Sequence, residues 1–281
     1  MHSITFVFDI DDTLGLHFSP ENWERETAEV IEVYGKDFLD RHTIQAIGYP
    51  HFIFPGIPTL WRWLHKQGHR FAIFSSAVKE RNEEFTDRFA ELAFGDQAEE
   101  IRFSIKVFSR NDCFDTYQTG NQQAYQPIFF GNKKKVLSGV VVPPEEMPWT
   151  LLIDDDRSYM ALNEEYNYIR VEIGCTGLYP ISARSFQAHA YFYKAFYLAG
   201  LFQSIFDKME KNGDSAIEAA KFIQIDSVDQ SFDCLFFYPT INDIRFYQEG
   251  ERILSSIDTE IKIPQTIMQR MQSLDYEFVP K

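Results

Sequence analysis

Short apolar runs that end abruptly in polar residues mark the strands expected in this chain. Residues 4–8 are apolar apart from Thr5 and are followed at once by acids, and residues 150–153 repeat this pattern. Apolar runs of this length, bounded by polar residues, are typical of buried strands. The pattern predicts strands at 4–8, 71–74, 103–108, 150–153 and 168–173.

Stretches with helical periodicity lie between and after these strands. Residues 57–70 carry an apolar stripe of Leu60, Trp61 and Leu64 and are closed by Gly68, which is the pattern of an amphipathic helix. Alternation of strands and helices is typical of the α/β class. Further helices are expected to begin near Pro20 and to cover 36–46, 79–94, 192–212, 216–225 and 242–257.

The chain is predicted to consist of a core, residues 1–180, with two additions. Residues 15–55 form a small helical insertion, either a modest lid over a site or a helical excursion packed on the sheet edge. Residues 181–281 form a mainly helical C-terminal extension. Its aromatic stripe is more typical of a core than of a membrane face, because the polar face is not rich in Lys or Arg. Packing on the core, binding to a partner and contact with a membrane surface all remain open for it.

Composition narrows the classes of partner. The 281 residues are 44% hydrophobic and 25% charged, as in ordinary globular proteins, and the net charge is −15. This acidity argues against nucleic acid, whose phosphate backbone requires a basic surface. The cysteines, Cys113, Cys175 and Cys234, are odd in number and widely spaced, which favours a reducing compartment. With no signal-peptide pattern and no apolar stretch long enough to span a bilayer, a cytoplasmic location is expected.

Acidic residues follow the first predicted strand. Asp9, Asp11 and Asp12 come directly after residues 4–8, with Thr13 behind them. Sites in open α/β sheets lie just beyond the carboxyl ends of the strands. In a locally extended chain Asp9 and Asp11 would point the same way, and their repulsion would need a cation or a shared proton. Oxygen ligands of this kind suit Mg²⁺.

Polar residues follow two other strands, and a basic run lies between them. Ser75 and Ser76 come after residues 71–74, and three acids, 154–156, come after residues 150–153. Each feature alone has an ordinary explanation: a serine can cap a helix, and acids are common in loops. The run of lysines, 133–135, would by itself be a solvated surface.

Taken in order, these residues resemble the motifs of the haloacid dehalogenase (HAD) superfamily. Residues 6–13, Phe-Val-Phe-Asp-Ile-Asp-Asp-Thr, resemble its first motif. The resemblance implies a Rossmann-like HAD core with a mainly parallel sheet and a small or absent cap. It implies that Asp9 attacks a phosphorus atom and becomes an aspartyl-phosphate. It also implies that Asp11 protonates the leaving oxygen and then activates water.

The later motifs follow in the family order. The resemblance implies that Thr13, Ser75, Ser76 and Lys135 bind the phosphoryl group, with Lys133 and Lys134 open as alternatives for the lysine. Lys135 is favoured because a Lys-x-Leu helix start is common in the carboxy-terminal-domain-type phosphatases. The residues implied to bind Mg²⁺ are Asp9, Asp11, Asp154 and Asp155. One acid of the last pair would complete the metal site and the other would hold the lysine.

The substrate is the least constrained part of this interpretation. An acid at Asp12, and the sequence Ile153-Asp154-Asp155, resemble the phosphoprotein phosphatases of the superfamily. A small cap leaves a site open to a phosphate displayed on a protein, and phosphotyrosine is favoured. The layout also resembles tyrosine phosphatases that bacterial pathogens deliver into host cells. A small-metabolite phosphatase or phosphotransferase of the same superfamily, and a binding protein without turnover, are the alternatives.

Overall fold

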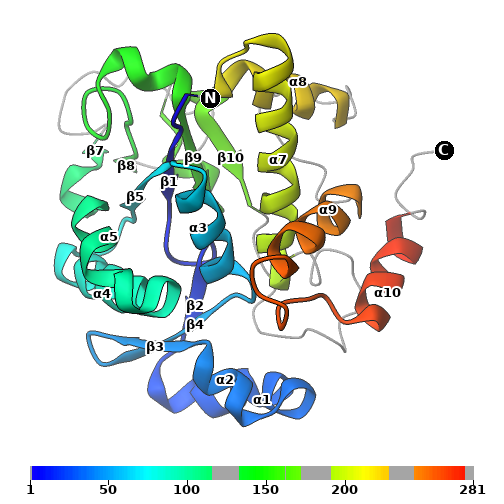
Figure 1. The fold of residues 1–281 in the computed structure, drawn as a ribbon. Coiled ribbons are helices and arrows are strands. Elements are labelled where there is room, and N and C mark those ends of the chain that lie inside the picture. The colour runs from blue at the N-terminus through cyan, green and yellow to red at the C-terminus, as the bar shows by residue number, and fades with distance from the viewer. Residues whose placement is uncertain (1, 116–132, 162, 172–190, 228–243, 276–281) are drawn as a thin grey trace.

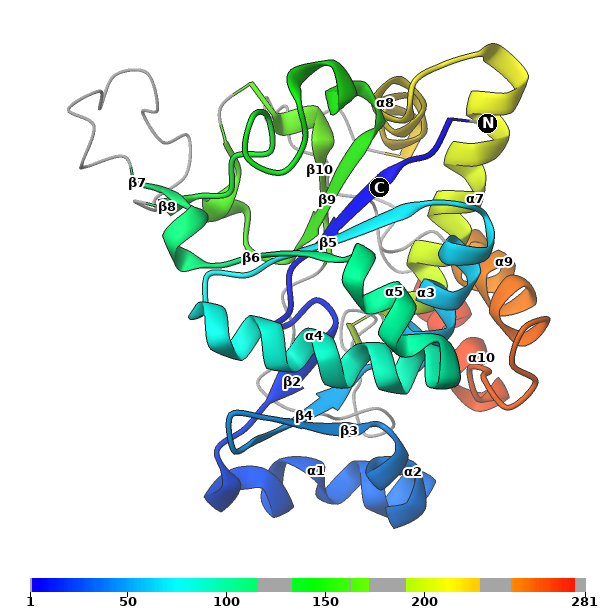
Figure 2. The same cartoon turned by 60° about the vertical axis from the view of Figure 1, so that its left-hand side comes forward.

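The central sheet has five parallel strands in the order β10-β9-β1-β5-β6 (Figures 1 and 2). The computed structural model describes residues 2–115, 133–161, 163–171, 191–227 and 244–275. The strands of the sheet are β1 (Thr5–Phe8), β5 (Arg70–Phe74), β6 (Lys106–Phe108), β9 (Thr150–Asp154) and β10 (Tyr168–Arg170). The predicted α/β fold with a Rossmann-like, mainly parallel core is confirmed.

The register of the strands brings their carboxyl ends to one level. Phe8 of β1 pairs with Ile73 of β5 on one side and with Ile153 of β9 on the other. The Asp9 N–H continues this ladder by donating to the Ile153 carbonyl at 2.9 Å. The polar residues that follow these three strands therefore meet at one edge of the sheet.

Side chains alternate between two apolar layers along each strand. Phe6 and Phe8 of β1 face helices, with ring centroids 4.6 Å from Phe202 and 5.0 Å from Trp61 respectively. Val7 faces the other layer, which contains Leu137, Val141 and Val142. The helices at the first layer are α3 (Ile57–Lys66) and α7 (Lys194–Asn212), and α4 (Lys79–Phe94) packs against α3. The core is thus built by the period-2 pattern of the strands.

The insertion at 15–55 is only partly helical. It contains β2 (Gly15–His17), α1 (Pro20–Tyr34), α2 (Lys36–Arg41), β3 (Thr43–Ala46) and β4 (Tyr49–Ile53), and its strands form an antiparallel sheet in the order β2-β4-β3. The predicted helix at 36–46 is wrong beyond Arg41. Thr43 and Ile44 are β-branched, and Ile47 and Gly48 both have positive φ, which closes β3 and β4 as a hairpin.

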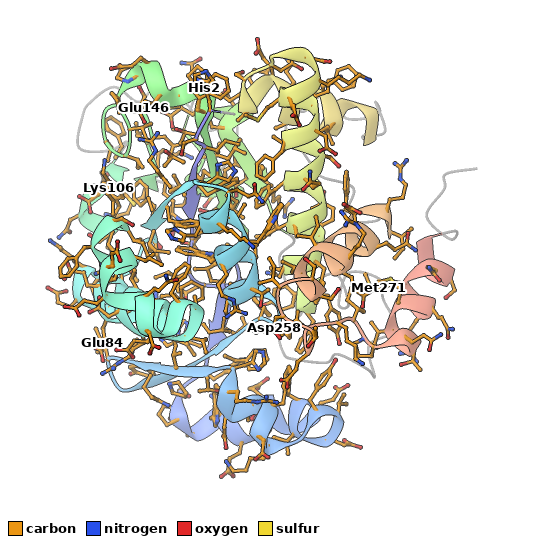
Figure 3. The ribbon with its side chains drawn as sticks, viewed as in Figure 1. His2, Glu84, Lys106, Glu146, Asp258 and Met271 are labelled. Atoms are coloured by element: carbon orange, nitrogen blue, oxygen red, sulfur yellow. The ribbon has the colours of Figure 1, made fainter. Side chains whose placement is uncertain are left out.

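This insertion lies beyond the carboxyl end of β1, below the sheet in Figure 1. The backbone N–H of Ile47 in the hairpin donates to Glu84 of α4 at 2.9 Å (Figure 3 labels Glu84). β3 also packs along α4. The insertion is therefore attached to the core on the side where the strands end.

The predicted strand at 103–108 is half wrong. Helix α5 (Ala98–Ser104) occupies its first part, and β6 begins at Lys106. The alternation misled because Phe103 is 84% exposed on the helix surface, whereas Ile101 and Ile105 are buried. In the predicted loop at 110–131, the short strand β7 (Phe114–Asp115) pairs with β8 (Lys133–Lys134). Residues 116–131 of that loop lie outside the described residues.

The helices after residue 190 share the main core. They are α7, α8 (Ala216–Ser227), α9 (Ile244–Ser255) and α10 (Gln265–Asp275). The described part of the predicted extension is mainly helical, and α7 packs on the core, one of the alternatives left open by the sequence. Asp258, after α9, pairs with Arg62 of α3 at 2.9 Å (Figure 3). The predicted boundary near residue 180 lies outside the described residues and stays a prediction. Among the helices that the structure describes, none combines the length and apolarity needed to cross a membrane.

Two glycines set the crossing of α7 and α9. A Cβ on Gly250 would collide with the carbonyl oxygen of Phe196, and one on Gly200 would collide with that of Phe246. Backbone atoms cannot yield as a flexible side chain does, so the helices would have to separate. The close approach requires glycine at both positions.

We expect Gly250→Ala to lower the free energy of unfolding by about 1–3 kcal/mol, the usual cost of overpacking. A gain in helix propensity of about 1 kcal/mol would offset part of this. Urea titration measures the change, with Glu210→Ala, at an exposed site on α7, as the control. A Gly250→Ala protein as stable as the parent would contradict the packing described.

A buried histidine links stability to pH. His69 is 5% exposed, its Nδ1 accepts the Ile4 N–H at 3.2 Å, and burial lowers its pKa from 6.5 to about 4. Between these values the unfolded chain binds a proton that the folded chain does not. Its contribution to stability is therefore present above pH 6.5 and is lost as the pH falls toward 4.

We expect His69→Gln to flatten the fall in melting temperature between pH 6.5 and pH 4, even if its stability at neutral pH is lower. Thermal unfolding followed by circular dichroism at several pH values gives the slope. His65→Gln, at an exposed position, is the control and should keep the parent slope. Equal slopes for all three proteins would remove His69 from the acid sensitivity.

Candidate active site

A buried ammonium lies between two carboxylates at the carboxyl edge of the sheet. Lys135 Nζ donates to Asp9 Oδ1 at 2.6 Å and to Asp154 Oδ2 at 2.5 Å. Lys135 is 1% exposed, Asp154 0% and Asp9 6%, so water hardly screens the contacts. Two ion pairs therefore connect residues from three distant parts of the chain.

The segment around Lys135 is held by backbone contacts and does not begin a helix. The Lys135 N–H donates to the Tyr159 carbonyl at 2.7 Å, and its ammonium lies 4.8 Å from the centre of the Tyr159 ring. The carboxylate of Glu164 accepts the N–H groups of Leu137 and Ser138, two and three residues further on. Of the three lysines in the run, Lys135 reaches the carboxylates, whereas Lys134 donates to the Ser158 carbonyl.

Three carboxylates gather beside this lysine. Oxygen atoms of Asp9, Asp154 and Asp155 all lie within 4.8 Å of one another. Burial, together with the neighbouring charge of Asp154, raises the pKa of Asp9 to about 7 against the attraction of Lys135. Burial and the charges of Asp154 and Asp9 raise the pKa of Asp155 to about 8.

This donor set fits a hard divalent cation. The raised pKa values mean that the negative charges of these neighbouring carboxylates are not fully compensated, and a bound cation would compensate them. All the donors are oxygen atoms, which Mg²⁺ prefers. Asp9, Asp154 and Asp155 could hold such an ion. The carboxylate of Asp11, predicted as a further ligand, does not belong to this group.

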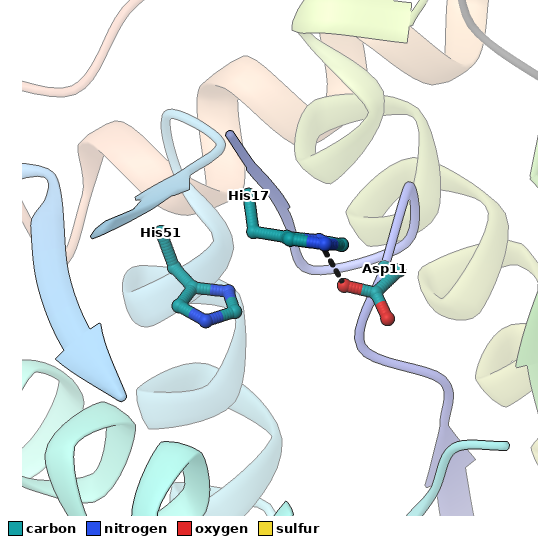
Figure 4. Close-up of side chains that lie close together, drawn as sticks. All are labelled: Asp11, His17 and His51. Carbon is teal, nitrogen blue, oxygen red and sulfur yellow. Dashed lines mark hydrogen bonds and ion pairs between the residues drawn. The ribbon is translucent and has the colours of Figure 1, made fainter. Parts of the chain in front are cut away.

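Asp11 instead faces the insertion and α4. Its carboxylate accepts hydrogen bonds from both terminal nitrogens of Arg81, one of them at 2.7 Å, and from His17 Nδ1 at 2.9 Å (Figure 4). Burial would raise the pKa of Asp11, but the hydrogen bonds from His17 and Arg81 outweigh it and hold that pKa well below its usual range. Asp11 is therefore ionised in this arrangement.

The predicted phosphate-binding hydroxyls lie around the same edge. Thr13 is fully buried, and its Oγ1 has no hydrogen-bond partner among the described residues. Ser75 is 1% exposed, and its Oγ accepts the Ala77 N–H at 3.4 Å. Ser76 is half-buried and uses its carbonyl to accept from Arg110 Nε at 2.8 Å. The Thr13 hydroxyl is therefore a buried polar group that no described residue satisfies.

A second buried lysine, not anticipated from the sequence, reaches the loop after β1. Lys194 at the start of α7 is 2% exposed and donates to the carbonyl of Asp12. Its ammonium lies 4.4 Å from the ring centre of Phe54 and 4.1 Å from that of Tyr191. The Tyr191 hydroxyl donates to Asp12 Oδ1 at 2.5 Å. The extension therefore holds Asp12 by both its main chain and its side chain.

This contact stabilises an unusual backbone conformation. Asp12 has φ of 58°, in the left-handed region that Asp tolerates better than most residues. The turn lets the Asp12 N–H bond to the Gly15 carbonyl at 2.9 Å and directs the chain into β2. A signal for Lys194 does exist in the sequence, since it is a lone charge within the aromatic stretch 191–202.

Comparisons with known proteins give only distant structural likenesses. No protein-family model matches the sequence, and no curated protein matches it. Among solved structures, a form of the fission yeast RNA polymerase II CTD phosphatase Fcp1 bound to beryllium fluoride is 11% identical, with a TM-score of 0.39. Another structure of Fcp1 is 13% identical, with a TM-score of 0.37. Each match covers 96% of this chain and 70% of that chain. The fold is assigned from its strand order and direction, not from these distant likenesses.

We expect Lys194→Met to loosen the loop at residues 10–15, because Asp12 loses a charge-assisted hydrogen bond and a buried cation. Amide hydrogen exchange in that peptide should quicken, while exchange in β5 stays unchanged. Lys211→Met, on the exposed side of α7, is the matched control. Unchanged exchange at residues 10–15 in Lys194→Met would show that the loop holds its conformation without α7.

Proposed function

We propose that the protein is a Mg²⁺-dependent phosphomonoester hydrolase that works through an aspartyl-phosphate on Asp9. The observation that carries this proposal is the position of Asp9, at the end of β1, with its carboxylate held by the Lys135 ammonium and flanked by Asp154 and Asp155. A carboxylate nucleophile needs a neighbouring positive charge both to stay ionised and to approach an anionic phosphate.

Each neighbouring group has a role in this reaction. Lys135 neutralises the nucleophile and the bound phosphoryl oxygens, and Thr13, Ser75 and Ser76 donate hydrogen bonds to those oxygens. Asp9, Asp154 and Asp155 would hold Mg²⁺, which supplies positive charge for the phosphoryl oxygens when bound.

Asp11 is the acid and base of the proposal. It protonates the leaving oxygen and then takes a proton from the attacking water, so it must change protonation state between the steps. Paired with Arg81 and His17 it is ionised, the form that accepts a proton. Substrate binding must therefore loosen this pairing before Asp11 can donate one.

The proposed substrate is a phosphorylated protein, with phosphotyrosine favoured. The insertion at 15–55 is small, and His17, which contacts Asp11, is about half exposed, so this side of the site is open to a bulky substrate. A small phosphomonoester is the alternative that an experiment must separate. The comparisons give no support to an origin among bacterial effectors, and that part of the resemblance stays a prediction.

The test is Asp9→Asn assayed with p-nitrophenyl phosphate and Mg²⁺. An amide cannot form the covalent intermediate, so turnover should fall by about a thousandfold or more while the melting curve is unchanged. Parent activity should disappear in excess chelator and should not return with Ca²⁺, which prefers more ligands and a looser geometry. Asp96→Asn, at an exposed position, controls for the loss of a carboxylate.

A panel of phosphotyrosine and phosphoserine peptides, phosphosugars and nucleotides then tests the substrate class. Higher kcat/KM for phosphotyrosine peptides is the expected result. Near-parent turnover by a folded Asp9→Asn protein would exclude Asp9 as the nucleophile. A parent protein that hydrolyses none of these esters with Mg²⁺ present would favour a binding protein instead.

A further inference from the structure

A second group of potential metal ligands lies where the insertion meets the core. A carboxylate oxygen of Asp11 and ring nitrogens of His17 and His51 all lie within 4.8 Å of one another. Asp11 belongs to the loop after β1, His17 ends β2, and His51 lies on the neighbouring strand β4, directly paired with His17. Figure 4 shows the His17 imidazole hydrogen-bonded to the Asp11 carboxylate and the His51 imidazole next to that of His17.

The two histidines differ in a way that suits an ion arriving from solvent. The His51 side chain is 1% exposed, and its Nε2 is buried without a hydrogen-bond partner among the described residues. A buried polar atom without a hydrogen-bond partner is rare in folded proteins, and a bound ligand would satisfy it. The side chain of His17 is 49% exposed, so an ion can reach the group from that side.

We propose that Asp11, His17 and His51 form a binding site for a Zn²⁺-like transition-metal ion, separate from the Mg²⁺ site and inhibitory to the reaction. Two imidazole nitrogens and one carboxylate oxygen are the donors that Zn²⁺ accepts, whereas Mg²⁺ prefers oxygen alone. Asp9, Asp154 and Asp155 offer oxygen only, so the two groups select different ions.

Inhibition follows from the identity of the carboxylate. An ion on Asp11 would occupy the oxygen that donates and accepts the proton in the proposed reaction. It would also join the insertion to the catalytic loop, because β2 and β4 supply the two nitrogens. This consequence rests on the proposed function, whereas binding of the ion does not.

Arg81 is the natural competitor for this site. Its guanidinium donates to both oxygens of Asp11, so it places a positive charge beside the position of the ion. A carboxylate has about four lone-pair positions; Arg81 takes one on each oxygen of Asp11 and His17 another on Oδ1, so an ion would take the position of the His17 hydrogen bond or the remaining one on Oδ2. Removing Arg81 should therefore strengthen metal binding, the opposite of removing a ligand.

The test is calorimetric titration of ZnCl₂ into the full chain with Mg²⁺ in excess, with Co²⁺ as a spectroscopic probe of nitrogen ligation. One Zn²⁺ per chain should bind. His17→Gln should weaken binding by about tenfold or more, since even losing a residue that only supports a ligand costs about 10–100-fold. Arg81→Gln should strengthen it, and His65→Gln, at an exposed histidine, should leave it unchanged. His17 is preferred to His51 for substitution because its exposure makes misfolding less of a concern.

Asp154→Asn separates the two sites. If the proposal holds, this protein still binds one Zn²⁺ and gives the parent Co²⁺ spectrum, although its hydrolysis is impaired. In the parent, Zn²⁺ should slow p-nitrophenyl phosphate hydrolysis at saturating Mg²⁺, and His17→Gln should relieve that effect. Binding that survives in His17→Gln but is lost in Asp154→Asn would overturn the proposal, as would the absence of stoichiometric binding. If Zn²⁺ binds as expected but no parent hydrolysis is found, the proposed function fails and the metal site stands.

Discussion

The contact of Lys135 with Asp9 and Asp154 is the constraint on which the candidate site depends. All three groups are almost free of solvent, and burying a charge is tolerated only when it is paired. Removing one partner from such a group generally costs about 3–5 kcal/mol, because an uncompensated charge remains inside. The end of β1, the end of β9 and the segment before residue 137 must therefore meet at one place.

That requirement explains why the core could be inferred from the sequence. Buried parallel strands read as apolar runs, and the acids that end them stand out against that background, as at Asp9 and Asp154. Along the chain, Asp9 is followed by Ser75, then Lys135, then Asp154. This order was enough to predict that these residues meet at one edge of one sheet. The favoured choice of Lys135 rested on an expected helix start that the structure lacks, although its ammonium does lie between the two carboxylates.

Other features depend on contacts that leave little local trace. The hairpin β3–β4 was missed because its strands are short and its turn is Ile47-Gly48 rather than a common turn pair. Arg81 lies in a charged helix, where nothing marks it as the partner of Asp11. The family resemblance implied that Asp11 binds the metal, and its spacing from Asp9 suggested that both carboxylates point the same way. The left-handed turn at Asp12 and the pull of Arg81 direct its side chain toward the insertion instead.

The contacts of Tyr191 and Lys194 with Asp12 join residues that are synthesised at very different times. Asp12 and Lys194 are 182 residues apart, so β1, which Asp9 directly follows, leaves the ribosome long before α7 does. Domains generally fold from the N-terminus as synthesis proceeds. A nascent chain would hold every acidic residue of the sheet edge, yet lack the lysine that fixes the turn after β1. The candidate site is thus completed at a late stage of translation, and a chain that ended before α7 would lack the lysine that holds the loop after β1.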